Sequence, residues 1–188
     1  MSIRMTKLEA VNVCLRALGE QEVPSVLESY PTVSLALQAI EDANIDLQLQ
    51  EWWFGKNRCA TLALTQDNQC PCPADTILFI PECSKYKWVG DSVVMEKDNS
   101  PYIDHPVTGE LTVLVAFENL PVLAQRAVAY TAAATLYSED VGVDNVYQVQ
   151  AQKAQQALLK MGAVHTRSRH ANSHHKKQLS RFYRLRTI

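Results

Sequence analysis

Cysteine and histidine side chains in the middle of the chain are the first candidates for chemistry, because thiolates and imidazoles bind zinc. Cys70 and Cys72 flank Pro71, and Cys83 and His105 follow. A structural zinc site usually has four ligands in two closely spaced pairs, and here the fourth ligand is missing unless His105 supplies it. Buried or free thiols explain the same residues more simply, and the odd number of cysteines fits a reducing compartment. The sequence therefore predicts no metal site.

Clustered carboxylates are the second candidate, since paired acids can perform general acid–base catalysis. Glu139, Asp140 and Asp144 lie close together in the sequence, but they flank a predicted helix break. Solvated turn residues, with Asp144 as a helix N-cap, are the expected role there. We therefore assign them no catalytic function.

Histidines are concentrated near the C-terminus, on a segment that we expect to lack the scaffold needed to hold ligand geometry. They are His165, His170, His174 and His175. The chain also has no glycine-rich phosphate loop, Gly-x-Ser-x-Gly elbow or His-Glu-x-x-His pair. We expect no enzymatic activity and no cofactor.

The strongest functional signal is a basic C-terminal segment, residues 163–188, which we call the arm. It has no acidic residue and a net charge of +7, whereas residues 1–162 hold 20 acidic and 11 basic residues. Its candidate binding residues are Arg167, Arg169, Lys176, Lys177, Arg181, Phe182, Tyr183, Arg184, Leu185 and Arg186. The arm cannot form a core of its own, so we expect it to be extended and to need a partner.

Two interpretations of the arm remain open. The positive charges could neutralise nucleic-acid phosphates while Phe182 and Tyr183 stack on bases, which predicts steep salt dependence. Alternatively, the basic residues steer the arm to an acidic protein surface while the apolar side chains anchor in pockets. Apolar anchors so near the chain end favour a protein partner.

The element that carries the arm is a predicted helical hairpin between Asn119 and Gly162. Pro121 suits a first helical turn, and alanine and tyrosine residues then recur at spacings of three and four. Residues 139–143 break the pattern, Asp144 can cap the second helix, and Gly162 suits a helix end. The residues that recur along one face of each helix are mostly alanine and tyrosine, so the hairpin alone buries too little apolar surface. It therefore needs further helices to form a stable core.

Two N-terminal helices supply that surface. Thr6 and Glu9 form a capping-box pattern for a helix that ends at Gly19. A second helix is predicted from Pro31 or Thr32 to about Glu51, with Val33, Leu37, Ile40 and Leu47 toward the core. The aromatic residues 52–54 follow. We interpret them as side chains that pack against the helices where the chain enters the next element. The alternative is an aromatic surface that binds a ligand.

The hydrophobic period changes between residues 56 and 118. Alternating or short apolar runs predict strands near 60–64, 76–80, 86–89 and 92–95, with a tight turn at Gly90-Asp91. A last strand is predicted from Leu111 to Phe117, opened by a turn at Thr108-Gly109. Five prolines lie in the predicted connections between these strands. The pattern therefore predicts a small antiparallel β insertion.

Composition places these elements in a globular protein. The 188 residues are 47% hydrophobic and 20% charged, and no apolar run approaches the roughly 20 residues that span a bilayer. The N-terminus leads into a helix signal rather than an export segment, so we expect synthesis in the cytoplasm and no membrane partner.

The order of these parts resembles the tail tubular protein A family, the head-to-tail adaptors of T7-like short-tailed bacteriophages. The resemblance covers roughly residues 5–162. Four features carry it in chain order. The first two are residues 8–12 with Leu18-Gly19-Glu20 and Pro24-Ser25, and the helix from Ala36 to Glu51 running into Trp52-Trp53-Phe54. The others are the β-rich middle, and Leu120-Pro121 opening an alanine-rich helix with a second helix behind it.

What the resemblance implies is a structural virion protein. Such adaptors form a twelve-fold ring under the portal, seat a tail nozzle of the tail tubular protein B type, and leave a channel for packaging, retention and ejection of the genome, which passes without sequence recognition. Their C-terminal segments reach toward the portal. The localisation implied is the virion, at the interface of head and tail.

We therefore predict an α+β protein with a bundle of four helices, a small antiparallel β insertion between the second and third, and an extended C-terminal arm. The parts are residues 1–55 and 119–162 for the bundle, 56–118 for the insertion and 163–188 for the arm. A ring needs a heterologous interface. Candidates for it are Trp52, Trp53, Phe54, Tyr130, Tyr137 and Tyr147, with core packing inside one subunit as the equal alternative. The alternative function is a nucleic-acid-binding packaging or regulatory protein that uses the arm.

Overall fold

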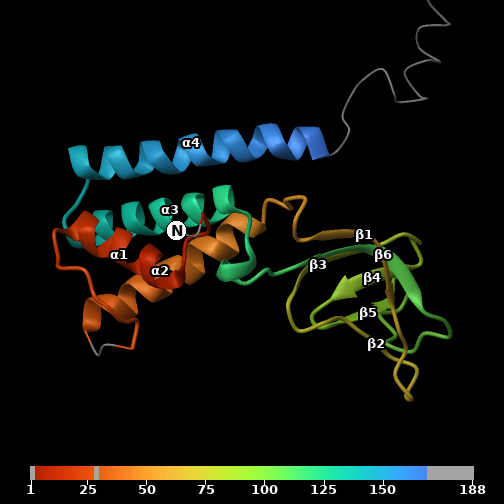
Figure 1. The fold of residues 1–188 in the computed structure, drawn as a ribbon. Coiled ribbons are helices and arrows are strands. Elements are labelled where there is room, and N and C mark those ends of the chain that lie inside the picture. The colour runs from red at the N-terminus through yellow and green to blue at the C-terminus, as the bar shows by residue number, and fades with distance from the viewer. Residues whose placement is uncertain (1–2, 28–29, 169–188) are drawn as a thin grey trace, which may run out of the picture.

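The computed structural model describes residues 3–27 and 30–168, and over these ranges the chain is α+β, as predicted. Figure 1 shows the helices gathered on one side and the strands on the other. A separate hydrophobic cluster lies within each group. We call these two groups the helical part and the β part.

Helix α1 (Lys7–Leu18) confirms the predicted capping box. The Glu9 N–H donates a hydrogen bond to the Thr6 hydroxyl at 3.2 Å, and the Thr6 N–H donates to the Glu9 carboxylate at 2.7 Å. Gly19, with a φ of 80°, follows the last helical residue, and glycine adopts this left-handed conformation at low cost. Both ends of α1 therefore follow from local sequence.

Helix α2 (Pro31–Gln48) buries Val33, Ile40 and Leu47, as the spacing predicted, whereas Leu37 is half-buried against the same core. Its end at Gln48 precedes the predicted end near Glu51. The helix begins with proline at its first position, where the missing N–H would have no intrahelical partner.

The β part consists of two three-stranded antiparallel sheets, with strand orders β1-β6-β3 and β2-β5-β4. The strands are β1 (Lys56–Leu62), β2 (Cys70–Pro71), β3 (Thr76–Pro81), β4 (Tyr86–Val89), β5 (Ser92–Met95) and β6 (Val107–Val113). The predicted turn at Gly90-Asp91 is confirmed: it joins β4 to β5, and Gly90 has a φ of 58°. The small core of this part includes Phe79, Val93 and Leu111.

Strand β6 begins earlier than predicted. A strand is present at Leu111, as predicted, but it ends at Val113 and not at Phe117. The predicted turn at Thr108-Gly109 is wrong, because both residues are paired within the sheet. A Cβ atom on Gly109 would lie 2.4 Å from the Ile80 carbonyl oxygen. The glycine is therefore required by the close approach of a neighbouring strand rather than by a turn.

A 3₁₀ turn, η1 (Phe117–Asn119), leads into the helical hairpin of α3 (Val122–Asp140) and α4 (Asn145–Ser168). The predicted end of the second helix at Gly162 is wrong, because α4 continues through this glycine to Ser168. A Cβ atom on Gly162 would meet nothing within 4 Å, so no close packing demands glycine there. Residues 163–168, which the sequence assigned to the arm, therefore belong to α4.

Helix α3 is the central helix of the helical part. Figure 1 shows α4 running along one side of it, with α1 and α2 on the other. Most of its buried positions are alanines, and small side chains allow close helix packing. The core of the helical part also includes Leu15, Ile40, Phe117 and Met161, so all four helices and η1 contribute to it.

Two buried glutamines fasten the link from β6 to α3 onto the helices. Gln48, 2% exposed, accepts a hydrogen bond from the Val115 N–H and donates one to the Val115 carbonyl oxygen, both at 2.8 Å. Gln125, fully buried, donates to the Phe117 carbonyl oxygen at 3.1 Å and accepts from the Met5 N–H at 3.0 Å. Buried backbone groups need such partners, so these side chains fix the path of the returning chain.

The link that leaves α2 lies beside the link that returns to α3. The Val113 N–H donates a hydrogen bond to the Gly55 carbonyl oxygen at 2.9 Å. A Cβ atom on Gly55 would lie 2.9 Å from the Val113 carbonyl oxygen, so the two backbones touch. The helical and β parts are thus joined by two adjacent segments bound to each other.

Candidate assembly surfaces

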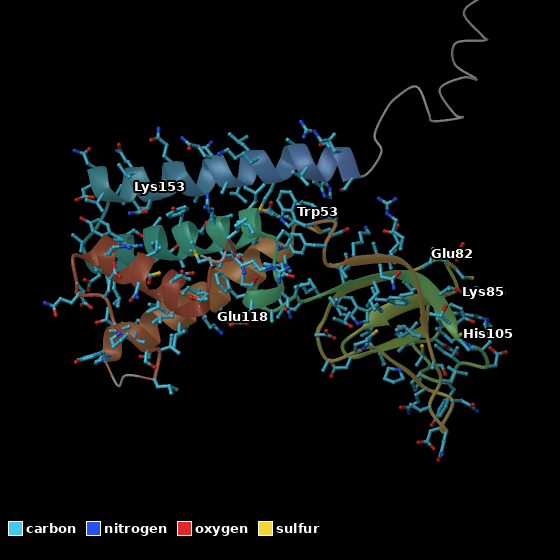
Figure 2. The ribbon with its side chains drawn as sticks, viewed as in Figure 1. Trp53, Glu82, Lys85, His105, Glu118 and Lys153 are labelled. Atoms are coloured by element: carbon cyan, nitrogen blue, oxygen red, sulfur yellow. The ribbon has the colours of Figure 1, made fainter. Side chains whose placement is uncertain are left out.

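The three aromatic residues that follow α2 form a half-buried cluster against the helical core. Trp52 donates a hydrogen bond from Nε1 to the Leu47 carbonyl oxygen at 2.8 Å. The rings of Trp52 and Trp53 meet edge to face, with centroids 6.2 Å apart, and Phe54 lies 5.3 Å from Trp53. Figure 2 shows Trp53 where the helices meet the strands. These rings are therefore held largely by their own chain.

His165 has a scaffold, contrary to the expectation for the C-terminal histidines. It lies on α4, and its ring centroid is 5.4 Å from that of Trp52 and 6.0 Å from that of Trp53. The contact ties the last turns of α4 to the link after α2. It explains why the helix continues past Gly162: the residues beyond the glycine gain packing partners.

The three tyrosines proposed for the subunit interface lie at the α3–α4 contact. Tyr137 is 7% exposed, and its hydroxyl donates to the Asp144 carboxylate at 2.7 Å. The Lys153 Nζ atom lies 5.4 Å from the ring centre of Tyr130. Tyr147 is half-buried, and its N–H donates to Asp144 at 3.1 Å. Each of them thus has contacts within its own chain.

Asp144 combines the roles of N-cap and hydrogen-bond acceptor. Its carboxylate accepts from the Val146 and Tyr147 N–H groups at the start of α4, which confirms the predicted cap. The hydrogen bond from Tyr137, followed by the backbone N–H groups, lowers the pKa of Asp144, and the same bond raises the pKa of Tyr137. The carboxylate is therefore held in its charged form at the turn between α3 and α4.

We expect Asp144→Ala to lower the melting temperature at neutral pH more than Asp144→Asn does, because asparagine is also a good N-cap. The folded pKa is below the ordinary value, so the stabilisation is present above that value and is lost as the pH falls through the folded pKa. Both variants should therefore show a weaker loss of stability below about pH 4 than the parent chain. Melting followed by circular dichroism at several pH values measures this.

Asp140→Ala, on the last residue of α3, is the matched control for that experiment. It removes a carboxylate from the same turn without touching the cap. An equal loss of stability in this control would show that net charge at the turn, rather than the hydrogen bonds of Asp144, carries the effect.

The cysteine and histidine candidates of the β part do not form a cluster. Cys70 is buried, Cys72 is half-buried and Cys83 is exposed, while His105 is bonded to Tyr86 at 2.9 Å. Burial raises the pKa of Cys72 to about 11, so its sulfur is a protonated thiol at neutral pH. Within residues 3–27 and 30–168 no group of three side chains could hold a metal ion. Figure 2 shows His105 at the end of the β part far from the helices.

The arm residues predicted to bind a partner fall mostly beyond the described ranges. Arg167 lies exposed on the last turn of α4. The following residues lie outside the part that the structure describes: Arg169, Lys176, Lys177, Arg181, Phe182, Tyr183, Arg184, Leu185 and Arg186. The described helices also include none long and apolar enough to cross a membrane.

Comparison with known proteins gives two concordant matches. A family model described as "Tail tubular protein" matches residues 8–171 of the chain. The chain is also similar to a protein named Tail tubular protein A from Klebsiella phage KP34, with 29% identity over 153 residues. That alignment covers 80% of this chain and 82% of the phage protein. Both matches extend over the helical part and the β part.

Proposed function

The chain belongs to the tail tubular protein family, a family of structural proteins of the phage tail, and on this premise we propose that it is the head-to-tail adaptor of a short-tailed phage. In this proposal the copies form a ring, expected to be twelve-fold, between the portal and the tail nozzle. The ring lines the channel through which the genome is packaged, retained and ejected. Its role is structural, without enzymatic activity.

The observation that carries the proposal is the division of charge along the chain. Residues 1–162 hold 20 acidic against 11 basic residues, whereas the segment from 163 onward has basic residues and no acidic ones. An acidic channel wall repels DNA phosphates and lets the duplex slide. A basic segment with apolar residues near its end suits an acidic groove on a protein partner, which we propose to be the portal.

In this proposal the helical segments, residues 1–55 and 119–162, form the ring body, and residues 56–118 form an insertion in it. A ring requires one face of each subunit to fit a different face of the next. The aromatic cluster at 52–54 would offer its exposed edges to that contact, as would Tyr130 and Tyr147, which are half-buried.

The alternative is a nucleic-acid-binding packaging or regulatory protein, favoured by the seven basic residues and the aromatic pair of the arm. The two functions differ in their salt dependence. If seven phosphates were neutralised, the logarithm of the DNA affinity would fall against the logarithm of salt concentration with a slope of about −6.

The test is therefore a pair of binding measurements on the full chain. Docking on purified portal rings of the same phage is followed by sedimentation and electron microscopy, and binding to a short duplex is titrated from 50 to 300 mM salt. We expect docking on the portal and no tight duplex binding at physiological salt. Duplex binding with the steep slope, together with no docking, would favour the alternative.

A further inference from the structure

Helix α2 carries an exposed face that no other described element covers. Its outward residues recur at spacings of three and four, as in a coiled-coil seam: Leu35, Gln38, Asp42, Ile45 and, just past the helix, Leu49. All are exposed, Leu35 by 53% and Leu49 by 57%. They lie opposite the buried side of the helix, so the core of the same chain does not use them. We call this set the α2 stripe.

A groove runs beside the α2 stripe, between α2 and α3. It has a volume of about 270 Å³, and its lining includes Leu35, Asp42, Asp46 and Glu139. Within residues 3–27 and 30–168 none of these three carboxylates has an ion-pair partner. The groove is therefore acidic, with an apolar residue exposed at its side.

Helix α4 has the opposite charge. It contains no acidic residue, whereas α2 contains no basic one. Along one flank of α4, exposed residues recur with the same spacing as in the α2 stripe: Val149, Lys153, Gln156, Lys160, Ala163 and Arg167. We call this set the α4 stripe. Lys160 and Arg167 have no ion-pair partner among the described residues.

The two stripes cannot meet within one chain. Helix α3 lies between α2 and α4, as Figure 1 shows, and the α2 stripe faces away from the core. A second copy, however, can place its α4 stripe against the α2 stripe of the first. The pair then still has one free α2 stripe, on the second copy, and one free α4 stripe, on the first, so further copies can add head to tail until a ring closes.

We infer that the α4 stripe of one copy docks on the α2 stripe and the acidic groove of the next, so that the basic flank of α4 with Lys153, Lys160 and Arg167 lies along the groove that Asp42, Asp46 and Glu139 line. This interface deepens the proposed ring and rests on that function. The apolar residues on the α2 stripe favour a protein surface as the occupant over a nucleic acid, whose phosphates the carboxylates would repel. The matching helical spacings let side chains of the two helices interleave.

Charge reversal on exposed residues tests the interface. Variant A is Asp42→Lys with Asp46→Lys, and variant B is Gln156→Glu with Lys160→Glu, which avoids Lys153 because that lysine contacts Tyr130 in its own chain. Each variant alone places like charges against each other, so we expect self-association at least about tenfold weaker than in the parent. A 1:1 mixture restores opposite charges at every contact and should recover assembly. Sedimentation over micromolar to millimolar concentrations at low salt measures this.

Chemical cross-linking provides a second test on the parent chain. A zero-length reagent joins a carboxylate directly to a lysine that lies beside it. A mixture of ¹⁴N- and ¹⁵N-labelled protein should give inter-copy links between Asp42 or Asp46 and Lys153 or Lys160. Three outcomes would overturn the inference. The first is inter-copy links confined to other elements, and the second is self-association that both variants leave unchanged. The third is a parent chain that stays monomeric at millimolar concentration. Self-association through these stripes without portal docking would support the interface and contradict the proposed function, so the two failures are distinguishable.

Discussion

Removal of residues 169–188 is expected to abolish docking on the portal while the rest of the chain stays folded. The removed segment carries six of the seven basic residues of the arm and all of its proposed apolar anchors. An apolar side chain buried in a pocket contributes about 1.5–3 kcal/mol, and 1.4 kcal/mol is tenfold in affinity. The expected loss is therefore more than about a hundredfold for each copy. Co-sedimentation with portal rings measures it.

The truncation must follow Ser168 because α4 continues to that residue. The described hydrophobic clusters extend along the chain to Met161, so this shortened chain should keep its melting temperature within about 2 °C. A shorter chain ending at Gly162 is the contrasting control. It also loses the packing of His165 on Trp52 and Trp53, and should melt earlier.

Two further variants separate the contributions of charge and anchoring. One replaces Phe182, Tyr183 and Leu185 with serine, and the other replaces Arg181, Arg184 and Arg186 with glutamine. If the arm anchors in pockets, the serine variant should dissociate faster. The glutamine variant should associate more slowly and show a weaker salt dependence, because three of the seven basic residues of the arm are removed. A chain ending at Ser168 that still docks would show that the arm is not the portal-binding segment.

Gln48→Leu should destabilise the protein by about 2–4 kcal/mol. The substitution leaves the Val115 N–H without its acceptor and removes one of the two side-chain donors to the Val115 carbonyl oxygen, the other being Asn44. A buried polar group left unpaired costs about 1–3 kcal/mol. Asn44 also loses the Gln48 donor to its side-chain oxygen at 2.8 Å. Urea unfolding gives the free energy, and hydrogen exchange should be faster at the Val115 amide.

Gln50→Leu is the matched control, since the same change is made at an exposed residue just after α2. Its effect should stay within about 0.5 kcal/mol. If Gln48→Leu were equally mild, the buried glutamine would fill space without fixing the returning chain. A second unfolding transition in the Gln48 variant would indicate that the helical and β parts had become independent.

Local signals in the sequence predicted several parts of the fold. The Thr6–Glu9 capping box, the cap at Asp144 and the turn at Gly90 each depend on residues a few positions apart, and each is present. The spacing of apolar residues along α2 likewise predicted which side is buried. These features need no knowledge of distant contacts.

The errors share a physical cause, because each depends on partners far away in the sequence. Thr108-Gly109 resembles a turn locally, but Gly109 is required by the Ile80 carbonyl of another strand. Gly162 resembles a helix end, but α4 beyond it packs on Trp52 through His165. Glutamine is ordinarily exposed, so the roles of Gln48 and Gln125 were missed.

A signal for the two glutamines was nevertheless present. Gln125 lies within the alanine-rich run of α3, and Gln48 follows the buried residue Leu47, so helical geometry places both near the core. A polar residue at such a position needs hydrogen-bond partners. Those partners, the backbone groups of residues 115 and 117, are recognisable only once the path of the returning chain is known.

The paired links between the two parts also determine how the protein responds to mechanical load. The β part is attached through two neighbouring backbone segments that hydrogen-bond to each other. The returning segment is also hydrogen-bonded by Gln48 of α2 and Gln125 of α3. A force applied to the sheets is therefore distributed over α2 and α3. With a single link, the same force would rotate the β part about that link. We therefore expect a rotation imposed on the β part to be transmitted to the helical part rather than absorbed at the link.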